Sequence, residues 1–553
     1  MAQVYFKQAK ISVNVQNGSS LLDAARTAGV TIESPCNGSG TCGKCRVIIA
    51  PDSYSHLYQK AGEGTFQEPG YVLACQSRVM DDVTVDLIPD VQNKDLKILN
   101  DGQSMANVEN PYITKKYNYK LHSTVIYAGG ELLGTESGNT ERKNYGIIVD
   151  IGTTTLVVSL VDVAKGQELF SESSLNPQAA YAHDVLSRIQ FATENNGLLL
   201  LYQGVIQEVN RLITEVAKKA RIAKKHIYEV VLSGNTCMLH LAINKSPGSL
   251  GKYPYQSQIE GGVLLKSVDY NLDIAEFGVT YLPPIISSFV GADITSGLLA
   301  CQLHHQNDTV LFVDIGTNGE MVLAVGGRLI ASSTAAGPAF EGMNILHGMR
   351  AGKGAIDSFE IHKHGFRMTT IGDVEAIGIC GSGLLDIVAE LVTYGVIDKN
   401  GRLKDAGSKD VPQFIKERLV SIEGKTAFQL SEKVWLSQKD IRQVQLAKGA
   451  IRSGIEFLLA GAEISAQDVQ RVLIAGSFGY HLRVKSLIEL GLLPEEFSNK
   501  VQMVGNTSKS GGQAFLLNQS YRKEMKEIVK KVEVIELADY QDFDRVFVDC
   551  LGF

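Results

Sequence analysis

The sequence predicts a multidomain protein of mixed α/β and α+β class, in which a small β-rich domain precedes a module of two related α/β halves. Three observations support this prediction. Four of the eight cysteines lie within the first 75 residues, in a segment of short alternating strands. An Asp-Ile-Gly-Thr turn between two apolar runs occurs twice, at 150–153 and at 314–317. The 553 residues exceed what one hydrophobic core usually supports.

Composition excludes two classes of partner. The formal net charge of -7 argues against a nucleic-acid binder, which normally presents a basic face. The chain contains no run of about 18 apolar residues, and its first residues lack a basic segment followed by an apolar core. We therefore expect a cytoplasmic protein that binds small molecules or other proteins, with no membrane and no nucleic acid.

The first 88 residues are expected to form one domain. Residues 3–15 alternate polar and apolar side chains, which is typical of strands, and Asn17-Gly18 marks a turn. The run 21–28 follows two serines and stops at Gly29, as expected of a capped helix. A last strand is predicted at 83–88. The pattern indicates a hairpin, a helix, a cysteine-bearing loop and further strands.

Four thiolates in this domain predict a metal or cluster site. The cysteines are separated by five, two and twenty-nine residues, at Cys36, Cys42, Cys45 and Cys75. A zinc site of four cysteines usually has two short Cys-x-x-Cys knuckles, whereas Cys75 stands alone. The loop of the first three is rich in glycine, which suits close wrapping of backbone amides around sulfide-bridged irons. The pattern favours a [2Fe–2S] cluster, and zinc remains the alternative.

This segment resembles the plant-type and adrenodoxin-type ferredoxins in the order of its elements and in its ligand pattern. The resemblance implies a β-grasp ferredoxin domain that carries single electrons. The plant-type spacing has four residues in the first interval, and this chain has five, which is nearer to the adrenodoxin variant.

Residues 89–144 are predicted to be a linker. Polar runs dominate this segment, and one alternating patch at 112–127 indicates a small hairpin. Such a tether would let the N-terminal domain swing between an electron source and an acceptor. Fixed docking on the large module is the alternative, and the sequence does not choose between them.

The duplicated turns are predicted to bind phosphate and a metal ion. Glycine lets backbone amides approach a phosphate closely, and threonine hydroxyls add donors. Each acid at the bend, Asp150 and Asp314, would face the same space and hold a hydrated Mg²⁺. The expected phosphate-binding residues are Gly152, Thr153, Thr154 and Thr155 in the first turn, and Gly316, Thr317, Asn318 and Gly319 in the second.

Each half carries a second strand that ends in a glycine turn, at Gly234-Asn235 and at Gly476-Ser477-Phe478-Gly479. These elements, in this order, resemble the superfamily of acetate and sugar kinases, heat-shock chaperone ATPases and actin. The resemblance implies an actin-like (ribonuclease H-like) ATPase with halves at 145–308 and 309–553, and ATP with Mg²⁺ as the ligand. It assigns Gly234 and Asn235 to a connecting element, and Gly476, Ser477 and Gly479 to the adenosine motif.

Three further stretches are candidates for the same cleft. Asp293, beside Gly291, either joins the cleft or caps a helix. The loop 336–342, with Glu341, lies where chaperone-type members place a glycine-acid loop near the nucleotide. A glycine turn that opens a helix suits ribose or phosphate contacts because free amides gather there; its residues are Gly381, Ser382 and Gly383.

The stretches 289–293, 344–351 and the helix predicted from Ser437 resemble one subgroup, the reductive activators of corrinoid proteins. That resemblance implies ATP-dependent reduction of an inactive Co(II) corrinoid to Co(I), with a corrinoid protein and a low-potential electron donor as partners. A homodimer is left open. One alternative is an ATP-driven electron donor to another low-potential enzyme, such as a radical dehydratase. The other is a redox-sensing module that binds nucleotide without being an enzyme.

Overall fold

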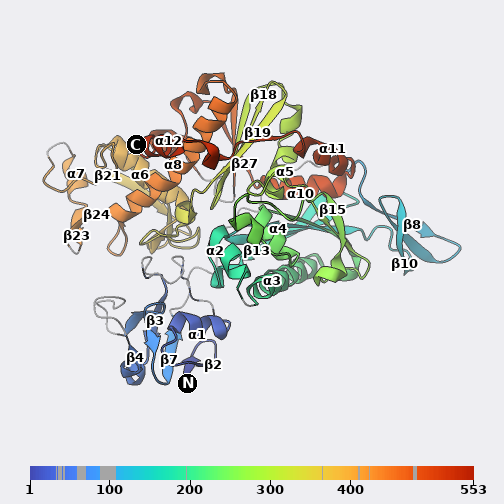
Figure 1. Cartoon of the computed structure of the whole chain (residues 1–553), viewed down its shortest axis with the longest axis horizontal. Coiled ribbons are helices and arrows are strands. Elements are labelled where there is room, and N and C mark those ends of the chain that lie inside the picture. The colour runs from blue at the N-terminus through green and yellow to red at the C-terminus, as the bar shows by residue number, and fades with distance from the viewer. Residues whose placement is uncertain are drawn as a thin grey trace.

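The computed structural model describes residues 1–30, 32, 34, 40, 44–58, 70–87, 108–194, 196–363, 365–408, 411–422, 424–476 and 482–553. Figure 1 shows the N-terminal domain below the large module and a small sheet that projects to the right of it. No helix in these ranges is long and apolar enough to cross a membrane.

The N-terminal domain is a β-grasp fold, as predicted. Its five-stranded sheet has the order β2-β1-β7-β3-β5, and the first strand pairs in parallel with the last. The β1–β2 hairpin closes after Phe6, and Asn17-Gly18 leads into the helix, whose N-cap is Ser20. The elements are β1 (Ala2–Phe6), β2 (Ile11–Val15), α1 (Leu21–Thr27), β3 (Arg46–Ile49), β4 (Leu57–Tyr58), β5 (Tyr71–Leu73), β6 (Arg78–Val79) and β7 (Val83–Leu87).

The segment predicted as a linker contains more structure than one hairpin. Three antiparallel strands form a sheet of order β10-β9-β8: β8 (Ile113–Asn118), β9 (Ser123–Ala128) and β10 (Glu131–Ser137). The third strand is mostly polar and exposed, so it gives little hydrophobic signal. Buried side chains on the other two strands, Ile113 and Ile126, pack against Tyr228 of the first half.

The two halves of the large module share the order of five strands, which confirms the predicted duplication, and the sixth strand lies at a different edge in each half. In the first, the strand order is β13-β12-β11-β14-β16-β15; in the second it is β27-β26-β17-β18-β19-β28. In both halves an antiparallel hairpin (β11–β12, β17–β18) is followed in the sheet by a parallel neighbour (β14, β26). The carboxyl ends of the central strands therefore lie at equivalent edges of the two sheets.

The first half contains β11 (Tyr145–Ile151), β12 (Thr155–Asp162), β13 (Gln167–Leu175), α2 (Val185–Ala192), α3 (Gly197–Ala220), β14 (Ile227–Gly234), α4 (Thr236–Ala242), β15 (Val263–Lys266), β16 (Val279–Leu282) and α5 (Ala292–Ala300). The sheet of the second half is formed by β17 (Val310–Ile315), β18 (Gly319–Val325), β19 (Arg328–Thr334), β26 (Arg471–Ala475), β27 (Val501–Gly505) and β28 (Glu533–Val534).

Further elements are inserted into the second half or close the chain. They are β20 (Ala355–His362), β21 (Gly365–Thr370), β22 (Gly378–Ile379), α6 (Gly381–Thr393), α7 (Gln413–Lys416), β23 (Leu419–Ile422), β24 (Lys425–Gln429), β25 (Trp435–Ser437), α8 (Gln438–Gly461), α9 (Val484–Glu489), α10 (Thr507–Leu517), α11 (Ser520–Val529) and α12 (Phe543–Asp549). The helix predicted from Ser437 is α8, and Ser437 is its N-cap in a capping box with Asp440.

Helix α10, near the end of the chain, packs on elements of the first half. A Cβ at Gly511 would lie 2.0 Å from the Ser296 carbonyl oxygen of α5, and one at Gly512 would lie 2.6 Å from the Ile148 side chain of β11. Only glycine permits this approach. The N-terminus of α10 is thereby fixed beside the end of β11.

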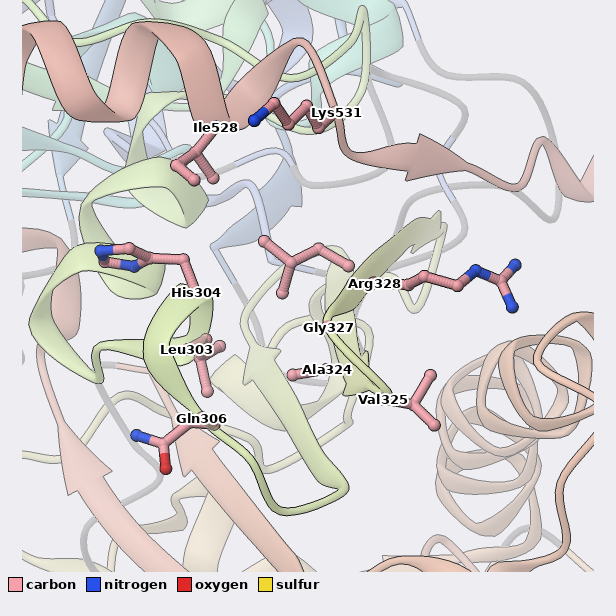
Figure 2. A pocket seen from close by; sticks show the side chains of 10 residues that line it. Leu303, His304, Gln306, Ala324, Val325, Gly327, Arg328, Ile528 and Lys531 are labelled. Carbon is pink, nitrogen blue, oxygen red and sulfur yellow. The ribbon is translucent and has the colours of Figure 1, made fainter.

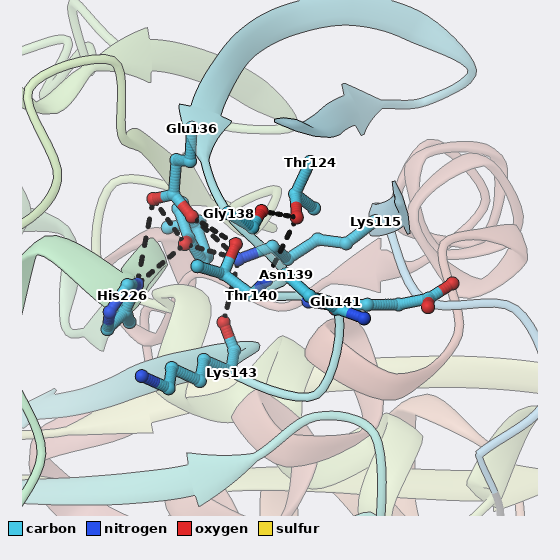
Figure 3. A network of polar contacts seen from close by, with 10 residues as sticks. Lys115, Thr124, Glu136, Gly138, Asn139, Thr140, Glu141, Lys143 and His226 are labelled. Carbon is cyan, nitrogen blue, oxygen red and sulfur yellow. Dashed lines mark hydrogen bonds and ion pairs between the residues drawn. The ribbon is translucent and has the colours of Figure 1, made fainter. Parts of the chain in front are cut away.

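A buried polar network holds the three-stranded sheet on the first half. Lys115 Nζ donates to Glu136 Oε2 at 3.1 Å, and Tyr228 Oη donates to Glu136 Oε1 at 2.6 Å. The side chains of Lys115 and Glu136 are 1% and 14% exposed. Figure 3 shows the contacts that converge on Glu136, including those from Thr140 and His226. Although burial alone would raise the pKa of Glu136, these hydrogen bonds lower it, so the carboxylate is ionised at neutral pH.

We expect Lys115→Met to weaken the attachment of this sheet. The substitution leaves the Glu136 carboxylate buried without its cation, and breaking a buried ion pair in this way commonly costs about 3 kcal/mol. Amide hydrogen exchange across 113–137 should become faster in the variant. Lys116→Met changes the exposed neighbour on the same strand and should leave the exchange rate as in the wild type. Equal exchange rates in the two variants would show that the Lys115–Glu136 ion pair does not stabilise the attachment of the sheet.

Candidate functional site

The first predicted phosphate turn connects β11 to β12. The Gly152 N–H donates to the Thr155 carbonyl at 2.9 Å, and Asn176 Nδ2 donates to the Gly152 carbonyl at 2.8 Å. The second glycine turn of this half touches it, because Asn235 Nδ2 donates to Thr153 Oγ1 at 3.2 Å. The structure thus brings together the two motifs of the first half.

A buried cation lies beneath this turn, and the sequence did not reveal it. Arg188 of α2 is fully buried, and its Nη2 donates to the Thr153 carbonyl at 2.5 Å. Burial lowers the pKa of Arg188 to about 10, which still leaves the guanidinium charged at neutral pH. A charge at this position favours an anion at the turn. The residue lies within an ordinary amphipathic helical pattern, so no local signal marked it.

The second turn connects β17 to β18 and faces the first. The Gly316 N–H donates to the Asn318 carbonyl at 2.9 Å, and the Thr317 hydroxyl donates to Glu341 Oε1. Thr317 Oγ1 lies 3.4 Å from Thr154 Oγ1 of the first turn. The duplicated turns therefore meet, Glu341 of the predicted glycine-acid loop adjoins them, and the region beside the two turns is the cleft that the sequence predicts.

Four carboxylates gather at this cleft: Asp150, Asp293, Asp314 and Glu320. Burial, followed by the charges of Asp293 and Asp150, raises the pKa of Asp314 to about 8. Burial and the neighbouring Asp150 raise the pKa of Asp293 to about 7. Burial, then Asp293 and Asp314, raises the pKa of Glu320 well above its ordinary value. Mutual repulsion of this kind is relieved by a bound cation, and oxygen donors suit a hard divalent ion.

Glu320 was not among the predicted site residues, although it closes the second turn. It lies directly opposite Asp314 in the β17–β18 hairpin, where the first half has Val157 opposite Asp150. Like charges at opposed positions on neighbouring strands are destabilising. The two turns therefore connect equivalent strands but differ in charge, because the second turn has the additional carboxylate of Glu320.

Asp293 does not occupy the N-cap position of its helix. It lies in the first turn of α5, whose N-cap position is Gly291. Asp293 Oδ1 accepts the N–H of the adjacent Ile294 at 2.9 Å. A Cβ at Gly291 would lie 2.5 Å from Asn235 Cα, so this glycine presses the start of α5 against the Gly234-Asn235 turn.

Asp150 is held from the far end of the chain. Asn506 Nδ2 donates to its Oδ2 and Ser508 Oγ donates to its Oδ1, each at 2.8 Å. Burial raises the pKa of Asp150, and these hydrogen bonds oppose the rise. Asn506 is the N-cap of α10. Sequence analysis missed both residues because they lie more than 350 positions from their partner.

The glycines of the connecting and adenosine motifs allow close backbone approach. A Cβ at Gly234 would lie 2.6 Å from the Ile151 carbonyl oxygen. Gly476 has a φ of +118°, and a Cβ there would lie 2.4 Å from the Ile315 carbonyl oxygen and 3.1 Å from Asp314 Oδ1. Ser477 and Gly479 lie outside the described residues, so their predicted role stays a prediction.

The glycines at the start of α6 are required because neighbouring backbone leaves no room for a side chain. A Cβ at Gly381 would lie 1.8 Å from the Phe340 carbonyl oxygen, and one at Gly383 would lie 2.1 Å from that of Ile356. The Ser382 hydroxyl donates to the Asp357 carbonyl at 2.9 Å. Contact of these three residues with a nucleotide remains a prediction.

Two of the four predicted cluster ligands are described, and they lie side by side. Cys45 precedes β3 and Cys75 follows β5; both are buried, and their sulfur atoms are 3.2 Å apart. Gln76 Nε2 donates to Cys75 Sγ at 3.6 Å. Cys36 and Cys42 lie outside the described residues. A close, buried pair of cysteine sulfur atoms fits two ligands of an iron–sulfur cluster.

Two residues that flank the predicted cysteine-bearing loop, Ser34 and Lys44, contact the large module, which agrees with the docked alternative. Lys44, next to Cys45, donates from Nζ to the Gly348 carbonyl at 2.7 Å and to that of Leu346 at 3.3 Å. The Ser34 N–H donates to His183 Nε2 of the first half at 3.2 Å. Burial lowers the pKa of His183 to about 3, so it accepts this bond as a neutral imidazole.

Comparisons with known proteins agree with this architecture. Residues 308–553 match the family model for the C-terminal domain of RACo, the ASKHA domain; residues 145–306 match the RACo middle region; and residues 4–80 match the 2Fe-2S iron-sulfur cluster binding domain. A solved reductive activator for corrinoid, iron-sulfur protein is 30% identical, with a TM-score of 0.73, over 100% of this chain and 98% of that chain.

Two curated relatives are similar over most of their length. The corrinoid activation enzyme RamQ of Eubacterium limosum is 29% identical over 99% of this chain and 98% of its own length. The [Co(II) methylated amine-specific corrinoid protein] reductase of Methanosarcina barkeri is 25% identical over 74% of this chain and 77% of its own.

We expect Asp293→Asn to stabilise the metal-free protein while removing a cleft carboxylate. The pKa of Asp293 is higher in the folded protein, at about 7, than in the unfolded chain, where it is near 4. Its carboxyl group therefore stabilises the fold below pH 4, and this stabilisation is lost as the pH rises through about 7. The gain in unfolding free energy should therefore be larger at about pH 8 than at about pH 5, by at least about 1 kcal/mol. Thermal unfolding in the presence of a chelator measures it.

Asp269→Asn is the matched control, because Asp269 is an exposed acid of the first half. It should change the unfolding temperature little at either pH. A fall in stability of the Asp293→Asn variant at both pH values would show that the carboxylates are not in mutual repulsion.

Proposed function

Because the chain belongs to the family of reductive activators of corrinoid proteins, we propose that it reduces the cobalt of a corrinoid protein from Co(II) to Co(I), with ATP hydrolysis driving the step. The observation that carries this proposal is the presence, in one chain, of a buried thiol pair and a carboxylate-lined cleft connected by one loop. A low-potential electron donor would supply the electron, and a corrinoid protein would receive it.

The joining of an electron carrier to an ATPase has an energetic reason. The [2Fe–2S] cluster supplies one electron at a time, at about −400 mV in plant-type ferredoxins. Each 59 mV by which the acceptor is more difficult to reduce costs about tenfold in a one-electron equilibrium. ATP offsets this deficit only if its binding or hydrolysis changes the complex with the acceptor. Two half-domains that close on one nucleotide provide such a change.

In this proposal, different residues of the cleft would bind the metal ion and the phosphates of MgATP. Asp150, Asp293, Asp314 and Glu320 would hold Mg²⁺ and its waters, which neutralises the phosphates and orients the attacking water. The two threonine turns and the charge of Arg188 would bind phosphate oxygens from opposite halves. Asn506 and Ser508 orient the Asp150 carboxylate toward the cleft.

One loop runs from this cleft to the cysteines. Glu341 accepts the Thr317 hydroxyl at the second turn, and a few residues later the carbonyls of Leu346 and Gly348 accept Lys44. Between them, Gly342 has a φ of +77°, and a Cβ there would lie 2.5 Å from the Met349 carbonyl oxygen. The loop is therefore tightly folded. We propose that nucleotide binding at Thr317 shifts this loop and releases Lys44, which uncovers the cysteine-bearing loop for the corrinoid protein.

Two alternatives considered from the sequence are less well supported. Activators of radical dehydratases resemble only the ATPase part, whereas the similarities here span all three parts of the chain. A redox sensor without enzymatic activity would not need the four cleft carboxylates. A homodimer remains a prediction.

The coupling of the two modules can be tested by complementation. Cys75→Ser should stop Co(I) formation because a cluster ligand is lost, and Asp314→Asn should slow it about ten- to a hundredfold because a metal-positioning carboxylate is lost. If both modules must act within one polypeptide, the mixed variants stay inactive. The cobalt absorption spectrum, recorded with reductant, corrinoid protein and MgATP, measures the rate.

Cys550→Ser and Asp269→Asn are matched controls, at a free cysteine and an exposed acid outside the site. Both should reduce the corrinoid at the wild-type rate. Wild-type reduction that proceeds equally fast without ATP would refute the proposed coupling, whatever the variants do.

The proposed release of the N-terminal domain predicts a gain in one variant. Lys44→Gln removes two charge-assisted hydrogen bonds at the docking contact, each worth about 1.5–3 kcal/mol. Without nucleotide, oxidation of the reduced protein by cytochrome c should therefore become at least about tenfold faster. Lys10→Gln removes an exposed charge from the β1–β2 turn and controls for electrostatics. An unchanged rate in Lys44→Gln would show that docking does not limit access.

A further inference from the structure

Two adjacent histidines and a glutamate converge at the connection between the two halves. His304 and His305 lie in a single 3₁₀ turn, η7 (Leu303–His305), between α5 and β17. Glu524 lies in α11. Its Oε1 is 3.3 Å from His304 Nε2 and 3.0 Å from His305 Nε2. One potential ligand atom from each of the three residues lies within 4.8 Å of the others.

This spacing fits ligands around one metal ion. With bonds of about 2.0–2.1 Å, tetrahedral geometry places two ligand atoms about 3.3 Å apart. Both measured separations to the glutamate oxygen are close to that value. Two imidazoles and a carboxylate form the ligand set of many zinc and other first-row transition-metal sites, whereas Mg²⁺ and Ca²⁺ prefer oxygen ligands alone.

The surroundings of His304 are a second observation. Its side chain is only 2% exposed, and Glu524 Oε1 lies 3.3 Å from its Nε2, but neither ring nitrogen has a partner with hydrogen-bond geometry among the residues that the structure describes. A buried polar atom without a partner is costly, and such groups call for an explanation. A metal ion on Nε2 would satisfy one of these nitrogens.

We propose that His304, His305 and Glu524 bind a divalent first-row transition-metal ion, with Zn²⁺ as the representative ion. The site is separate from the carboxylate cleft and from the four cysteines. Three protein ligands leave a fourth position for water or another small ligand.

The location indicates what the ion would do. The connector that carries the histidines starts after α5, whose first turn holds Asp293, and leads into β17, which ends near Asp314. Helix α11 directly follows α10, whose N-terminus holds Asp150. Figure 2 shows the neighbouring cavity, with His304 on one wall and Ile528, one turn beyond Glu524, on another. A bound ion would join the connector to α11 and stiffen the region between the halves.

Zinc binding to the anaerobic full-length protein tests this proposal. In millimolar Mg²⁺, which occupies oxygen-only sites, the wild type should bind one Zn²⁺, measured by titration calorimetry. Zinc K-edge absorption should show nitrogen and oxygen ligands at about 2.0–2.1 Å rather than sulfur at about 2.3 Å. Zn²⁺ should also raise the thermal unfolding temperature, because it binds only the folded site.

His305→Gln and Glu524→Gln remove ligands that are partly exposed, so both variants should fold. Each should weaken zinc binding at least about tenfold and abolish the thermal shift. His362→Gln, at an exposed histidine beside Glu360, is the matched control and should bind zinc as the wild type does. Equal affinity in all variants, absence of zinc binding by the wild type, or a sulfur shell around the zinc would overturn the proposal.

Discussion

Repulsion among four carboxylates in one cleft is the constraint on which the large module depends. Asp150 and Asp314 end equivalent strands, Asp293 begins α5, and Glu320 faces Asp314 across a hairpin. Charges of one sign at such spacing destabilise a low-dielectric site unless protons or a cation compensate. Because the carboxylates come from both halves, the Mg²⁺ ion that we propose to bind between them would draw the two halves together.

The end of the chain makes this arrangement possible. Helix α10 packs on β11 and α5 of the first half through Gly511 and Gly512. The strand that precedes it in the chain, β27, pairs with β26 in the sheet of the second half. This packing places Asn506 and Ser508 on Asp150. A movement of the halves must therefore either carry α10 with the first half or break the two hydrogen bonds to Asp150. The two halves are thus connected at Asp150 as well as at the connector between α5 and β17.

The sequence predicted what depends on local pattern. Cysteine spacing predicted the cluster domain, and the repeated Asp-Ile-Gly-Thr turn predicted both halves, because such turns carry their chemistry within a few residues. Arg188, Asn506 and Ser508 escaped prediction because their roles arise from contacts across long stretches of chain. Glu320 was visible in the second turn, but its importance depends on strand register, which places it opposite Asp314. The third strand of the 113–137 sheet escaped because its exposed, polar face lacks hydrophobic alternation.

The contact between the N-terminal domain and the large module connects the nucleotide site to the cysteines. The contacts of Ser34 and Lys44 with the large module place the described end of the cysteine-bearing segment beside that module. Lys44 contributes two hydrogen bonds to this contact, and its acceptors lie on the loop that begins at Glu341. A few kilocalories per mole of differential nucleotide affinity would be enough to change the docked population by orders of magnitude. In the proposed function, nucleotide binding would therefore expose the electron carrier to a corrinoid protein by releasing Lys44.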